Sequence, residues 1–158
     1  MSTDTERHHA QLRAWAKGSY GLEAATELLI RGFDGRFADP SCPWIHPTSS
    51  GHWIDFDSIP AQTGALSGGE QRFLQIAAAL SDGDTMVNLG RALAGQDRQR
   101  AHLVLAAVAH AAGTHQHQDL TVQPDGTVRF TRLGSIYRWD QPTSPESQAP
   151  RRDGGISR

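Results

Sequence analysis

Apolar side chains recur every three or four residues over most of the first 112 positions, and this spacing predicts amphipathic helices. The strongest helices are expected over residues 20–31, 67–80 and 98–112, where serine or aspartate can cap each first turn. Shorter helices are expected over residues 7–17 and 88–94. The pattern therefore predicts a predominantly helical body of four to five helices.

After residue 113 the apolar period changes to two, which is typical of half-buried strands. Alternating apolar and polar residues flank a Pro-Asp-Gly turn at 124–126, so residues 119–132 are expected to form an antiparallel β-hairpin. Residues 135–139 could add a third strand. Packed against the helices, this small C-terminal sheet gives an α+β fold.

Between the helices, residues 34–52 are rich in proline and glycine and are expected to form a long irregular connection. A short strand is expected over 53–57, where Ile54 and Phe56 alternate with aspartates. The two nearby tryptophans, Trp44 and Trp53, are candidate interface residues, because aromatic side chains dominate interface energetics.

The length and composition fit one globular domain over 1–140, followed by a disordered polar tail over 141–158. The net charge of −2 gives no global attraction to nucleic acid or to a membrane surface. The single cysteine, Cys42, cannot form an internal disulfide, and the N-terminus has no apolar targeting segment. A cytoplasmic protein without membrane contact is therefore expected.

Residues 66–72 read Leu-Ser-Gly-Gly-Glu-Gln-Arg and resemble the signature motif of ABC-type ATPases. In that family the serine and glycines at a helix start meet a nucleotide phosphate, so Ser67, Gly68 and Gly69 are candidate anion-binding residues. The chain lacks the phosphate-binding loop that such an ATPase needs. Ser67 and Glu70 also fit a capping box, which we prefer as the explanation.

A second resemblance covers about residues 15–117. Gly18-Ser19-Tyr20, the run from Glu23 to Ile30, Trp53-Ile54-Asp55, the 67–80 helix and His110-Ala111-Ala112-Gly113 together resemble small uncharacterised proteins of actinobacteria. The resemblance implies a bacterial cytoplasmic protein, with a mobile genetic element as a candidate source, and it implies no activity.

Three histidines near the end of the last helix, His110, His115 and His117, form the densest group of metal-ligating side chains. Three ligands with an open position would suit a catalytic zinc and a metal-dependent hydrolase. The alternative is a set of polar histidines at a helix C-terminus, where protonated rings suit the helix dipole.

Arginine and aromatic side chains gather in the C-terminal strands, at Arg129, Arg132, Tyr137, Arg138 and Trp139. Such a surface could bind a nucleic-acid backbone and stack on bases. The alternative is a sheet edge that charge protects against aggregation.

No complete catalytic set can be assembled from these residues, so no cofactor is expected. The sequence therefore favours a non-enzymatic interaction or regulatory module that binds another protein, with self-association as one form of this. A metal-dependent hydrolase that uses the histidine group and a nucleic-acid-binding accessory protein are the alternatives.

Overall fold

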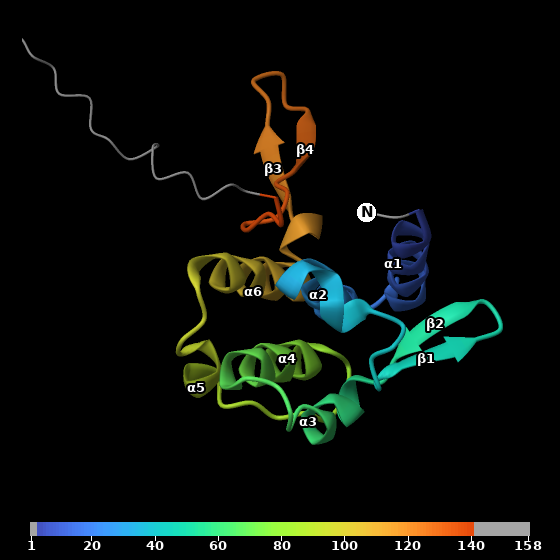
Figure 1. Ribbon diagram of the computed structural model, residues 1–158. Coiled ribbons are helices and arrows are strands. Elements are labelled where there is room, and N and C mark those ends of the chain that lie inside the picture. Colours follow the sequence, from blue (N-terminus) through green and yellow to red (C-terminus); the bar gives the residue numbers. More distant parts are fainter. Residues whose placement is uncertain (1–2, 141–158) are drawn as a thin grey trace, which may run out of the picture.

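The computed structural model describes residues 3–140, and this part of the chain has an α+β fold, as predicted (Figure 1). Its α-helices are α1 (Thr3–Ala16), α2 (Tyr20–Arg31), α3 (Ile59–Gln62), α4 (Gly68–Leu80), α5 (Leu89–Leu93) and α6 (Arg98–Ala111). Its strands form two antiparallel pairs, β1 (Ile45–Thr48) with β2 (Gly51–Ile54) and β3 (Gln118–Val122) with β4 (Val128–Arg132). Short 3₁₀ helices η1 (Gly32–Ala38), η2 (Phe56–Ser58) and η3 (Thr114–Gln116) connect these elements.

Helix α2 lies at the centre of the body and packs against α6, α4 and α1. Its side chains Ala24, Ala25, Leu28 and Leu29 are all fully buried, because neighbouring helices cover several of its faces. Small side chains allow close packing at Gly21, where an added Cβ would lie 2.5 Å from the carbonyl oxygen of Leu80. The predicted helix over 20–31 is thus confirmed, and it organises the core.

Helix α4 begins as the sequence predicts. The hydroxyl of Ser67 accepts the N–H of Glu70, and the Glu70 carboxylate accepts the N–H of Ser67, which completes a capping box. Phe73, Leu74 and Ala77 are fully buried on the face that meets the rest of the core. The core residues form one cluster that α2 and α4 dominate and to which β1, β2 and α6 also contribute.

The segment over 34–52 is more ordered than its composition predicts. It contains η1 and then β1, which pairs with β2 in a hairpin that sets Ile45 opposite Ile54. The expected strand over 53–57 is therefore wrong in its bounds, because the strand ends at Ile54 and Phe56 starts η2. Both Ile54 and Phe56 are buried, so alternation in burial continues although the strand has ended.

The C-terminal hairpin is confirmed, but its surroundings differ from the prediction. Every residue of β3 and β4 is exposed, and Figure 1 shows the hairpin projecting from the end of α6 instead of packing on the helices. Residues 135–139 form no third strand but return to the helical body, where the Nε2 of His102 bonds the carbonyl of Arg138. The predicted tail over 141–158 lies outside the described residues. None of the helices within 3–140 has the length and apolar character that crossing a membrane requires.

Candidate functional site

The β3–β4 hairpin exposes one face that is entirely apolar at its centre. Its register sets Leu120 opposite Phe130 and Val122 opposite Val128, and opposed residues in an antiparallel pair point to the same side. The relative exposure of these four side chains runs from 50% at Val128 to 65% at Phe130. Four exposed apolar side chains on one face of a small sheet form a candidate surface for contact with another molecule.

The other face of the hairpin is polar. It carries Thr121 opposite Arg129 and Asp119 opposite Thr131. Arg132 lies on the apolar side, at the end next to Gln118. The two strand arginines that we considered for nucleic-acid binding therefore point to opposite faces of the hairpin.

The remaining members of the predicted nucleic-acid surface lie away from the strands. The ring of Tyr137 is 6.4 Å from that of His102 on α6. Trp139 is half-buried, and the guanidinium of Arg31 lies 5.4 Å from its ring centroid. The five residues are thus not gathered into one basic and aromatic surface.

The two predicted interface tryptophans have different environments. Trp44 is 3% exposed, and its indole N–H donates to the carbonyl of Phe37, so it is a core residue and its proposed interface role is wrong. Its ring lies 6.2 Å from that of Phe37 of η1, and both belong to the buried core cluster. Trp53 is 36% exposed and its ring lies 5.0 Å from that of His46, across the β1–β2 ladder.

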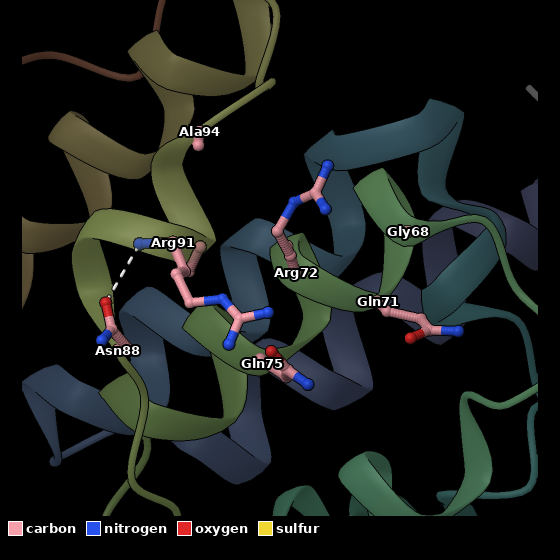
Figure 2. A pocket seen from close by; sticks show the side chains of 8 residues that line it. Gly68, Gln71, Arg72, Gln75, Asn88, Arg91 and Ala94 are labelled. Carbon is pink, nitrogen blue, oxygen red and sulfur yellow. Dashed lines mark hydrogen bonds between the residues drawn. The ribbon is translucent and has the colours of Figure 1, made fainter.

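At the predicted anion site at the start of α4, the polar groups of Ser67 are bonded to Glu70. One oxygen of the Glu70 carboxylate bonds the N–H and hydroxyl of Ser67, and the other pairs with Arg36 at 2.8 Å. These bonds hold the pKa of Glu70 below its ordinary value, because they favour the charged form. Gly68 nonetheless borders a pocket of about 530 Å³ between α4 and α5, which Figure 2 shows.

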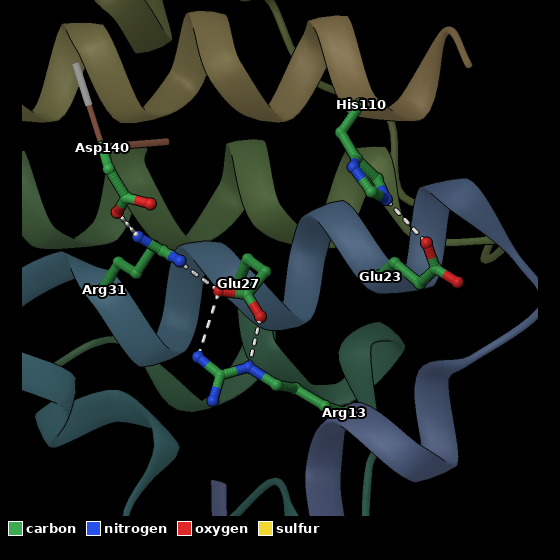
Figure 3. A network of polar contacts seen from close by, with 6 residues as sticks. All are labelled: Arg13, Glu23, Glu27, Arg31, His110 and Asp140. Atoms are coloured by element: carbon green, nitrogen blue, oxygen red, sulfur yellow. Dashed lines mark hydrogen bonds and ion pairs between the residues drawn. The ribbon is translucent and has the colours of Figure 1, made fainter. Parts of the chain in front are cut away.

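Two of the three predicted metal ligands come together. The rings of His110 and His115 stack with centroids 4.3 Å apart and nearly parallel planes, while His117 is exposed on the way to β3. Figure 3 shows that His110 instead faces Glu23, with 2.6 Å between Nε2 and the carboxylate oxygen. Within the described residues no group of three or more His, Cys, Asp or Glu side chains could hold a metal ion.

The Glu23–His110 pair joins α2 to α6. The second oxygen of Glu23 accepts the N–H of Gly18 at 3.0 Å. Burial acts to raise the pKa of Glu23, but the hydrogen bonds from Gly18 and His110 outweigh it and hold the pKa below its ordinary value. Both oxygens of this carboxylate therefore have partners, and the pair acts as a cross-link between two helices.

A second polar network, also in Figure 3, centres on Glu27 one turn further along α2. Its carboxylate pairs with Arg13 of α1 and with Arg31 at 2.7 Å, and Arg31 also reaches Asp140 at 2.6 Å. Burial acts to raise the pKa of Glu27, but the two guanidiniums outweigh it and lower the pKa. The sequence gives one signal of this network and of the Glu23–His110 pair, since Glu23 and Glu27 share a face of α2 outside its apolar stripe.

The exposed hairpin face thus remains as the clearest candidate for a contact with another molecule. Sequence reasoning placed the hairpin correctly but expected its apolar face to be covered by the helices. Comparisons with protein-family models, with curated proteins and with solved structures find no match to this chain.

Proposed function

We propose that the protein is an interaction module that self-associates through the apolar face of its β3–β4 hairpin. The observation that carries this proposal is the exposure of Leu120, Val122, Val128 and Phe130 on one face. An isolated two-stranded hairpin is at best marginally stable in water, and it gains stability when another surface covers its apolar face. Fully burying one such side chain is worth roughly 1.5–3 kcal/mol.

A second copy of the chain is the partner that fits this face. A two-fold symmetric interface requires a patch that is complementary to itself. The central four side chains carry no charge, so two identical faces can stack without bringing like charges together. Arg132 lies at the end of the face, where it can stay in the solvated rim. The net charge of −2 adds little repulsion between two copies.

The oligomeric state of the full chain tests the proposal. We expect sedimentation velocity over a range of concentrations to show a monomer–dimer equilibrium. Phe130→Asp places a charge at the centre of the apolar face and should shift this equilibrium to monomer. Met86→Asp is the matched control, because Met86 is 94% exposed, apolar and outside the hairpin, so its variant should dimerise like the wild type.

Circular dichroism of both variants would confirm that the helical body is unchanged. A wild-type protein that stays monomeric over the whole range contradicts self-association. A Phe130→Asp variant that dimerises as well as the wild type places the contact elsewhere and equally contradicts the proposal.

A further inference from the structure

The pocket between α4 and α5 combines small apolar residues with cationic and amide side chains. Its volume of about 530 Å³ is in the range of small-molecule sites. The side chains that border it with polar groups are two arginines and three amides, namely Arg72, Arg91, Gln71, Gln75 and Asn88. Among residues 3–140, no carboxylate borders it. The pocket therefore offers many hydrogen-bond donors and two positive charges without a negative group to balance them.

Arg72 is held in this pocket without an anionic partner. Its Nε is buried and has no hydrogen-bond partner, and no ion pair to its guanidinium is found within residues 3–140. Two glycines leave room for the group, since a Cβ at Gly68 or Gly95 would lie 3.3 or 3.2 Å from its terminal nitrogens. This Nε is closed off from solvent, so the terminal nitrogens of the guanidinium are the donors that Arg72 can offer to a ligand.

Arg91 supplies the second guanidinium from the opposite wall. The cap at Asn88, whose side-chain oxygen accepts the N–H of Arg91 at 3.1 Å, fixes the start of α5. Figure 2 shows Arg91 extending from α5 toward Gln75 on α4, while the guanidinium of Arg72 points away from that of Arg91. The Arg91 side chain forms no ion pair in the described part of the chain. Two arginines on facing helices thus share one pocket.

This arrangement suits a phosphate group better than a carboxylate. A guanidinium binds phosphate oxygens through two parallel N–H···O bonds, and a dianion balances both positive charges. The pocket is larger than a phosphate ion, so it also has room for the rest of a small molecule. We propose that the α4–α5 pocket, which Arg72 and Arg91 both line, binds a small organic phosphate monoester.

Isothermal titration calorimetry on the full chain tests this site with three probes: inorganic phosphate, ribose 5-phosphate and AMP. We expect at least one of the two organic monoesters to bind more tightly than inorganic phosphate. The variants Arg72→Gln and Arg91→Gln should each weaken binding by about tenfold or more, as expected when a charge-assisted hydrogen bond is lost. Arg98→Gln is the matched control, since Arg98 is exposed and does not border the pocket.

Arg91 is exposed, so Arg91→Gln should fold even where Arg72→Gln does not. Absence of binding by all three probes overturns the proposal. Binding that Arg91→Gln leaves unchanged does the same, and so does equal affinity for inorganic phosphate and both monoesters. The pocket lies apart from the hairpin, so the result is independent of the oligomeric state.

Discussion

At the scale of single residues, the Glu27 side chain links several parts of the chain through ion pairs. It belongs to α2 and forms ion pairs with Arg13 of α1 and with Arg31. Arg31 in turn pairs with Asp140 near the end of the described chain. The Glu27 side chain is 15% exposed, whereas that of Arg13 is 45% exposed, so solvent screens part of the attraction. The contribution of the network to the free energy of unfolding therefore depends mainly on the half-buried carboxylate of Glu27.

We predict that Glu27→Gln lowers the free energy of unfolding at neutral pH by about 1–2 kcal/mol, because both guanidiniums lose a charged acceptor. The folded-state pKa of Glu27 lies below its ordinary value of 4.5, so its stabilisation is present above that value. It is lost as the pH falls through the folded-state pKa. The difference in the free energy of unfolding between Glu27→Gln and the wild type should therefore become smaller at acidic pH. Urea denaturation at several pH values would measure it.

Glu6→Gln serves as the control for this variant, because the exposed Glu6 of α1 has no ion pair within residues 3–140. Its stability should match that of the wild type to within a few tenths of a kcal/mol. A Glu27→Gln effect that is equally large at acidic and neutral pH would exclude the ionised carboxylate as its cause.

Ser67 gives a second prediction at this scale. Ser67→Ala removes the acceptor for the Glu70 N–H and should cost about 1 kcal/mol of stability. Ser49→Ala, in the exposed turn between β1 and β2, should have no measurable effect. Thermal unfolding of both variants would measure their melting temperatures. Equal melting temperatures would mean that the capping box contributes nothing to stability.

At the scale of elements, the junction of α2 and η1 packs directly against α4. A Cβ on Gly32 would lie 2.5 Å from the ring of Phe73, which is fully buried. We predict that Gly32→Ala destabilises the fold by about 1–3 kcal/mol, the usual cost of overpacking a core. Chemical denaturation would measure it against Gly64→Ala.

Gly64 is a suitable control because a Cβ there would meet no atom within 4 Å. Its variant should be close to neutral. If Gly32→Ala were as stable as Gly64→Ala, then α2 and α4 would have to separate easily, which contradicts a tightly packed core.

Helix caps and hydrophobic patterns explain which elements could be predicted from the sequence. The bounds of α2, α4 and α6 were predictable because Ser19, Ser67 and Asp97 cap apolar stripes of helical period. Helix α1 starts at Thr3, earlier than predicted, because its first turn over 3–6 is polar and exposed and offers nothing that a hydrophobic pattern counts. The β1–β2 hairpin was missed because proline-rich composition favours a loop, whereas the pairing of β1 depends on contacts with β2.

At the scale of the whole molecule, the sequence could predict the hairpin but not its exposure. Period-two alternation at Leu120, Val122, Val128 and Phe130 predicts that one face is covered, and it does not say by what. Helical partners were the natural expectation, but α6 ends before η3, and the hairpin extends beyond the helical body (Figure 1). Most of the network around Glu27 was hidden as well, because Arg13 and Asp140 lie far from Glu27 in the sequence.

Exposure of the hairpin leads to a prediction about local stability. Few tertiary contacts hold β3 and β4, so in the monomer their amide hydrogens should exchange much faster than those of α2, whose core residues are fully buried. Covering the apolar face in a dimer would stabilise the strand pairing. Hydrogen exchange measured by mass spectrometry should therefore show protection of residues 118–132 that rises with protein concentration, while protection of α2 stays constant.

Phe130→Asp should abolish this concentration dependence and leave fast exchange in the hairpin at every concentration, because the variant stays monomeric. Met86→Asp should behave like the wild type. Hairpin amides that exchange as slowly as those of α2 in dilute protein would mean that the hairpin is stable by itself. The exposed apolar face would then need no cover for folding, and the case for a second copy would have to depend on the measured oligomeric state alone.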